Sequence, residues 1–129
     1  MKELNIKFRG LTSSNEWVYG DLIHDMPNDT AYYSKFSQRI SWGHFNQPVK
    51  NGTVCMSSGL NDISDKEIYS GDIVYDPDED TNEVGLVLYD EGTFYVTLGN
   101  IIILLNEINE DVEIIGNIHD NPELLSKED

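Results

Sequence analysis

The sequence predicts a mainly β fold, a small β-barrel or sandwich whose C-terminal half is SH3-like. Short segments alternate apolar and polar residues with the period of a half-buried strand. Clusters of Gly, Asn, Asp and Pro separate these segments at short intervals, as in small all-β folds. The strongest helix signal is a short one, where Asn121 precedes Pro122 near the C-terminus. A chain of 129 residues forms one domain, or two small modules that share a core.

Residues 1–58 predict a β-rich, aromatic N-terminal segment. Its expected strands are 6–9, 16–20 with 22–23, and 53–56, and the first two should pair as a hairpin across a short polar loop. Residues 31–40 suit a strand or a helical face, and we favour a strand. Residues 43–52 are rich in Gly and Asn and contain Pro48, so they predict a loop.

Residues 59–74 predict a hinge between the two halves. We expect a tight turn at Gly59, a short bridge, and a second turn at Gly71 with φ > 0, which leads into a strand. Asp62 and Asp72 are expected to bind backbone N–H groups of these turns, as Asp side chains commonly do.

Residues 59–129 predict an acidic, barrel-like segment that ends in a short helical turn. Its strands are expected at 72–75, 83–89, 93–98, 101–105 and 112–118. A charged hairpin loop should fill 76–82, a tight turn 90–92, and helical turns 106–110 and 121–125. The two segments can also form one combined domain.

The formal net charge of -16 is unevenly distributed along the chain. Residues 1–59 contain six Lys or Arg and five acids, a net charge of +1, whereas residues 60–129 contain two Lys or Arg and nineteen acids, a net charge of -17. Strong negative charge repels nucleic acid and anionic lipid and attracts basic proteins. No apolar run reaches the length of a membrane span, and the first residues lack the apolar core of a signal peptide. With a single cysteine, Cys55, these features favour a protein of the reducing cytoplasm.

Five blocks of the sequence resemble the YopX family, whose members are small proteins of bacteriophages and prophages. These blocks are 6–9, 16–20, 59–62, 66–74 and 115–124, and they occur in the order expected for the family. The resemblance implies a mainly β fold, a location in the cytoplasm of a bacterial host and self-association into a homo-oligomer. It carries over no catalytic residue. One block departs from the family pattern, because Cys55 and Ser57 stand where a glycine and an aromatic residue are common.

Residue types that carry catalysis or bind metals are scattered. His24, His44, Cys55 and His119 occur singly, without the spacing of a zinc site. The acidic run 76–82 alternates oxygen ligands but lacks the central Gly and the distal Glu of a calcium loop. No glycine-rich phosphate-binding motif is present. We therefore expect a protein that is not an enzyme and uses no metal or cofactor.

The remaining hypotheses concern binding. Turns at one end of a small barrel lie close together, so seven acids are candidates for one negative patch that binds a basic host or phage protein, as a DNA mimic does: Asp76, Asp78, Glu79, Asp80, Glu83, Asp90 and Glu91. The competing interpretation is that these acids only keep the protein soluble. An alternative function is single-strand nucleic-acid binding by the basic and aromatic residues of the first half: Lys7, Arg9, Trp17, Tyr19, Tyr32, Tyr33, Lys35, Phe36, Arg39 and Trp42. The charge of the whole chain opposes this alternative.

Overall fold

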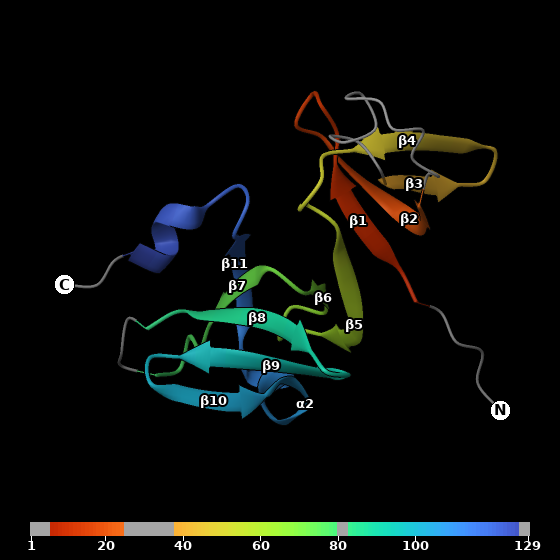
Figure 1. Cartoon of the computed structure of the whole chain (residues 1–129). Coiled ribbons are helices and arrows are strands. Elements are labelled where there is room, and N and C mark those ends of the chain that lie inside the picture. The colour runs from red at the N-terminus through yellow and green to blue at the C-terminus, as the bar shows by residue number, and fades with distance from the viewer. Residues whose placement is uncertain (1–5, 25–37, 80–82, 127–129) are drawn as a thin grey trace, which may run out of the picture. The chain divides into compact units, whose positions relative to one another are not determined.

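The computed structural model describes residues 6–24, 38–79 and 83–126, which contain eleven β-strands and three short helical segments (Figure 1). The strands form two antiparallel sheets, so the predicted mainly β class is confirmed. The chain divides into two compact units, Met1–Ser57 and Ser58–Asp129. Most of the segment 31–40, for which we favoured a strand, lies outside the described residues.

The first unit is an antiparallel sheet in the strand order β4-β3-β2-β1-β5. Its strands are β1 (Phe8–Leu11), β2 (Trp17–His24), β3 (Gln38–Trp42), β4 (Phe45–Val49) and the start of β5 (Cys55–Asn61). The predicted hairpin between the first two strands is confirmed, with Phe8 opposite Gly20 and Leu11 opposite Trp17. Ile40, Val49 and Cys55 are buried in this unit.

The prediction of a loop at residues 43–52 is wrong, because β3 and β4 form a tight hairpin in which Trp42 lies opposite Phe45. Gly43, with φ of 60°, supplies the left-handed conformation that the two-residue turn requires. Pro48 suggested a loop because proline cannot donate to a ladder. In β4, however, it lies at the edge of the sheet, where a missing N–H is tolerated.

The hinge departs from its predicted form at its first turn. Gly59 has φ of 77° but lies inside β5, so the tight turn expected there is wrong. The chain reverses instead at residues 62–66 and enters β6 (Glu67–Tyr69), which neighbours β5. The second turn is confirmed, since Gly71 has φ of 90° and leads into β7 (Asp72–Tyr75). The carboxylate of Asp72 accepts a hydrogen bond of 2.8 Å from the backbone N–H of Tyr69 and closes this turn.

The second unit contains a five-stranded antiparallel sheet in the order β10-β9-β8-β7-β11. Its further strands are β8 (Gly85–Asp90), β9 (Thr93–Leu98), β10 (Ile101–Leu104) and β11 (Glu113–Asn117). The prediction of at least four antiparallel strands between residues 72 and 118 is thus confirmed. Among the described strands the sheet stays open, with β10 and β11 as its edges, so the expected closed barrel does not form.

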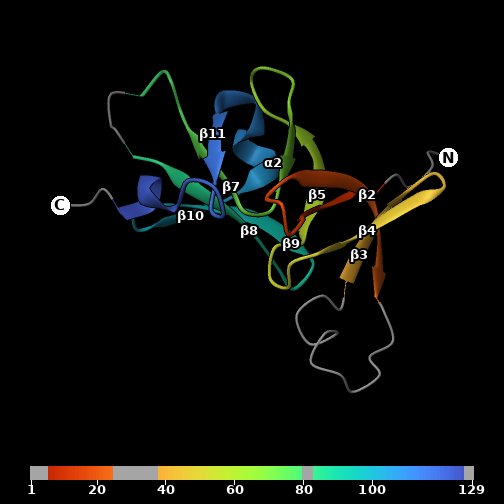
Figure 2. The same cartoon turned by 90° about the horizontal axis from the view of Figure 1, so that it is seen from above.

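The connection from β10 to β11 explains why the sheet is open. The segment comprises α2 (Leu105–Ile108) and the 3₁₀ turn η1 (Asn109–Asp111), and it crosses one face of the sheet from edge to edge (Figure 2). It buries Leu105 and Val112 against Ile68, Val74 and other residues of the core. The helical turn expected at 106–110 is therefore present, and it fills the space that a closing strand pair would need.

Strand β8 faces the core with Val87, which is fully buried, whereas Leu86 and Leu88 are half-buried on the opposite face. The alternation of apolar residues in 83–89 predicts that Leu86 and Leu88 are mostly buried, and this prediction is wrong. Either face of this strand is apolar enough to be buried, so its alternation did not identify the buried face. The described chain ends with the predicted helical turn, the 3₁₀ helix η2 (Pro122–Ser126).

Candidate functional site

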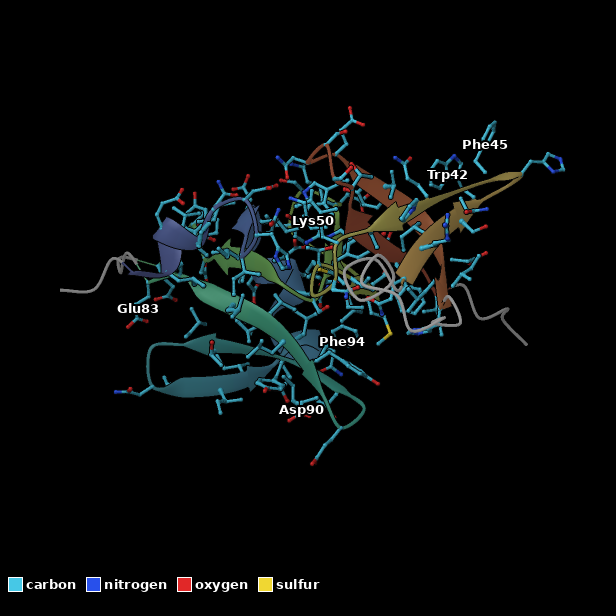
Figure 3. The ribbon with its side chains drawn as sticks, turned by 45° about the horizontal axis from the view of Figure 1, so that its top comes forward. Trp42, Phe45, Lys50, Glu83, Asp90 and Phe94 are labelled. Atoms are coloured by element: carbon cyan, nitrogen blue, oxygen red, sulfur yellow. The ribbon has the colours of Figure 1, made fainter. Side chains whose placement is uncertain are left out.

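The candidate acids lie at two separate ends of β8. Glu83 precedes this strand and Asp90 ends it, and Figure 3 shows their side chains far apart along the ribbon. A strand of six residues spans about 17–20 Å. The turns therefore do not combine into the single negative patch that we expected. The prediction assumed that these turns lie at the same end of a small barrel. Consecutive hairpin turns of an antiparallel sheet instead lie at opposite ends of the strands.

The acids of the loop between β7 and β8 border an apolar groove of about 260 Å³. Its walls come from β9, β10 and the connection to β11: Leu98, Ile101, Ile103, Ile108 and Val112. Asp76, Glu79 and Glu83 line the same groove. Asp78 lies on the loop and is exposed, and Asp80 lies outside the described residues. The structure therefore brings three of the seven candidate acids together.

Glu83 lies against the turn that joins β9 to β10. Its Oε2 atom is 3.0 Å from the position that a Cβ atom would take on Gly99. The loop after β7 and the turn before β10 are therefore adjacent at this end of the sheet. This end carries the acidic border of the groove, whereas Asp90 and Glu91 lie at the far end, near Phe94 (Figure 3).

Two other acids of the second unit are buried and bind backbone groups. Asp62 is 4% exposed, and its Oδ1 atom accepts hydrogen bonds of 2.9 Å from the N–H groups of Ser64 and Lys66. Its Oδ2 atom accepts a bond of 2.9 Å from Ile114 N–H, which ties the turn at 62–66 to β11. Asp72 is buried as well and bonds to Tyr69. These carboxylates stabilise the fold, as we expected from their positions in turns.

Among the described residues, the basic and aromatic side chains of the first half are not all exposed. Arg9 is 6% exposed, and its guanidinium lies 4.7 Å from the ring centroid of Trp17, a cation–π contact inside the first unit. Lys7 and Tyr19 are exposed, and Arg39 donates a hydrogen bond to Asn46. Tyr32, Tyr33, Lys35 and Phe36 lie outside the described residues.

The tip of the β3–β4 hairpin carries an exposed aromatic pair. The rings of Trp42 and Phe45 are stacked with centroids 6.4 Å apart, and Phe45 is 67% exposed (Figure 3). The aromatic composition indicated Trp42, but Phe45 was missed because it was assigned to a loop.

Cys55 and His119 fall in different compact units, residues 1–57 and residues 58–129. Cys55 is buried in the first unit, and its Sγ atom lies 3.4 Å from the carbonyl oxygen of Thr53, to which the thiol donates. The described ranges contain no group of three or more His, Cys, Asp or Glu side chains placed to hold a metal ion. Within the same ranges, none of the helices has the length and apolar character that a membrane crossing requires.

The fold and the groove define a small, acidic, two-unit β protein with an open sheet in its second unit. The chain belongs to the YopX family, because the model of the YopX protein family matches residues 7–126. Its structure is similar to the crystal structure of protein EF1440 from Enterococcus faecalis, with a TM-score of 0.60 and 23% sequence identity over 96% of this chain and 100% of that chain. At that identity the similarity concerns the fold alone. No curated protein matches the chain.

The sequence analysis did not identify the residues that form the walls of the groove, although the sequence contains a feature that marks this region. Residues 92–106 contain no charged side chain, within a half that otherwise carries many acids. The apolar run 101–105 was predicted as a strand, without a statement of its position in the sheet. In the structure Ile101, Ile102 and Leu104 are exposed.

Proposed function

We propose that this chain is an accessory protein of a phage or prophage that acts in the bacterial cytoplasm by contact with another protein and without catalysis. The phage origin rests on membership of the YopX family. The observation that carries the binding function is the groove beside β10, where apolar walls meet three carboxylates. A concave apolar surface with a few convergent polar groups is typical of binding sites.

The proposed partner has a basic surface. Residues 67–126 contain no Lys or Arg, so within that stretch the groove carboxylates have no cation of their own. In the part of the chain that is described, the carboxylates of Glu79 and Glu83 form no hydrogen bond or ion pair, unlike that of Asp62. Asp76 Oδ1 accepts a bond of 2.9 Å from the N–H of Asp78. Acids without a structural contact remain available for an incoming cation. Their negative field also accelerates association with a basic protein.

The test begins with affinity capture of partners from phage-infected host cells, followed by association kinetics with the captured protein. The double variant Asp78→Asn and Glu79→Gln removes two charges beside the groove. Its matched control, Asp90→Asn and Glu91→Gln, removes two charges at the other end of β8. We expect the first variant, and not the control, to slow association at about 0.1 M salt, where charges act over only about 10 Å and the two ends of β8 are screened from each other. Equal behaviour of both variants with a basic partner would mean that the acids have no specific recognition role.

Self-association is a second part of the proposal. Besides β10, the open sheets leave β4, β6 and β11 as edges among the described strands, and such edges pair readily between chains. Light scattering at micromolar concentration should give a mass above the 14.7 kDa of the monomer. A strictly monomeric protein would contradict this part alone.

Single-strand nucleic-acid binding by the first unit remains the alternative function, and the exposed Trp42–Phe45 pair is the observation that favours it. Exposed aromatic side chains stack on nucleic-acid bases. Oligonucleotide binding at low salt that is lost in Phe45→Ala, with the fold retained, would support the alternative over a protein partner.

A further inference from the structure

Strand β10 is an open sheet edge without the usual protection. Natural edge strands carry charges, proline or bulges that prevent pairing with other strands. The edge strand β4 contains Pro48, and β11 has a register shift between Ile114 and Gly116. Strand β10 is short but wholly apolar, with Ile102 69% exposed, and it has neither of these features. The fourth described edge, β6, is only three residues long, and its Ile68 and Tyr69 are buried. Of these edges, β10 is therefore the one best suited to accept an added strand.

The groove lies on one face of this edge. Leu98 and Ile101 are opposite each other in the β9–β10 ladder, and Ile103 lies two residues further along the same face. Together with Ile108 they form the apolar wall. A volume of about 260 Å³ is below the roughly 300–1,000 Å³ of pockets for small-molecule ligands. The groove accordingly suits one or two side chains from a protein segment better than a cofactor.

The negative charge at the border of the groove indicates which kind of segment binds there. The border of the groove consists of Asp76, Glu79 and Glu83, and the adjoining stretch of chain supplies no Lys or Arg. A second copy of this chain that paired here through its own β10 edge would bring its like carboxylates against this border, so self-association is expected at the other edges. A segment that combines an aliphatic residue with a Lys or Arg complements both the wall and the border.

We propose that the groove and the β10 edge together bind an extended segment of a basic partner protein, which adds a strand beside β10. Its aliphatic side chain occupies the groove, and its cation lies among the three carboxylates. This inference rests on the proposed function and specifies how the partner binds. Side chains two residues apart lie on one face of a strand, so the recognised pattern is an aliphatic residue and a Lys or Arg separated by one residue.

The probe is a synthetic peptide, acetyl-Thr-Lys-Thr-Ile-Thr-Lys-Thr-amide, titrated into the full ¹⁵N-labelled chain at low salt. We expect saturable shifts of the amide signals of residues 98–104. A peptide of the same composition with Lys and Ile adjacent places them on opposite faces and should bind more weakly. Two further versions, with methylated backbone nitrogens at the odd or at the even residues, each block one edge of the peptide, and the version that blocks the edge facing β10 should not bind.

Two exposed positions of β10 form a matched pair of protein variants. Ile101→Thr alters the wall of the groove, whereas Ile102→Thr alters the opposite face of the same strand. We expect Ile101→Thr to weaken peptide binding severalfold, because it removes an apolar contact with the peptide. Ile102→Thr should leave the affinity within a factor of about two. Glu79→Gln combined with Glu83→Gln should weaken binding by about three- to tenfold, since exposed ion pairs contribute little each.

The outcomes separate this inference from the proposed function. Binding that depends on Glu79 and Glu83 but tolerates backbone methylation and Ile101→Thr would overturn strand addition and leave the basic partner intact. Absence of binding by all the peptides would overturn the inference, while a basic partner captured from cells would still support the function. A fall in oligomer mass in Ile101→Thr, without an effect on peptide binding, would assign β10 to a second copy and overturn the inference as well.

Discussion

The acidic half contains two kinds of carboxylate that the sequence does not distinguish. Asp62 is buried and accepts three backbone hydrogen bonds, from Ser64, Lys66 and Ile114. Glu79 and Glu83 are exposed on the loop after β7, and their carboxylates form no hydrogen bond or ion pair in the described part of the chain. The first kind stabilises turns, and the second is available to a partner.

This difference bears on the net charge of -16. If every acid served solubility, replacing any of them would have a similar small effect. If the two kinds differ, the effects on the free energy of unfolding should separate clearly, while the effects on binding should follow the opposite order. Four substitutions test this comparison.

Asp62→Ala should have the largest effect. It leaves three backbone N–H groups without their acceptor, and hydrogen bonds to charged groups contribute about 1.5–3 kcal/mol each without full additivity. We expect the free energy of unfolding to fall by about 3–5 kcal/mol. Urea denaturation measures the change.

Asp62→Asn provides the control for this prediction. The amide keeps one oxygen acceptor and replaces the other with an NH₂ group, so some of the three bonds persist. The loss should lie clearly between those of the wild type and Asp62→Ala. An Asp62→Ala protein as stable as the wild type would place Asp62 with the solubilising acids.

Asp72→Ala should follow, with a loss of about 1.5–3 kcal/mol, because it removes the buried acceptor of the Tyr69 N–H. The same urea titration measures it. Asp78→Ala is the matched control, since Asp78 is an exposed Asp in the next turn of the chain. Equal losses in the two variants would contradict the division into two kinds.

Much of this turn chemistry could be predicted from sequence, because Gly and Asp both favour turns, Gly by adopting a positive φ and Asp by accepting bonds from nearby backbone N–H groups. The φ of 90° at Gly71 and the bond that Asp72 accepts from Tyr69 N–H agree with these preferences. The bond from Ile114 N–H to Asp62 could not be predicted, because it joins residues 52 positions apart. Only the tertiary fold brings β11 to the turn.

The groove was beyond prediction for a related reason. The run 101–104 is apolar enough to suit a buried strand, and its sequence does not show that the strand lies at an edge. Edge position follows from strand order, which here depends on the crossing of α2 and η1 over the sheet. The hairpin of β3 and β4 was missed similarly, since Pro48 is unfavourable in a central strand and acceptable in an edge strand.

Gly71→Val should cost about 1–3 kcal/mol through backbone strain at a positive φ. This change leaves both carboxylates in place, so it separates the contribution of the backbone conformation from that of Asp72 in the same turn. Gly92→Val is the reference variant. Gly92 also has a positive φ, of 81°, and a Cβ there meets no atom within 4 Å, so the stability lost in Gly92→Val measures backbone strain without a steric clash. An unchanged melting temperature in Gly71→Val would remove the strain argument.

The smallest effect on stability is expected for Glu79→Gln combined with Glu83→Gln. Surface substitutions away from structural contacts usually change stability by less than about 0.5 kcal/mol. Here the sign should be favourable, because two fewer negative charges reduce the repulsion within a half that has a net charge of -17. The melting temperature should therefore rise slightly at low salt and equal that of the wild type at high salt, where screening removes the repulsion. A loss of stability comparable to that of Asp72→Ala would show that the groove acids stabilise the fold. The distinction between the two kinds of carboxylate would then be wrong.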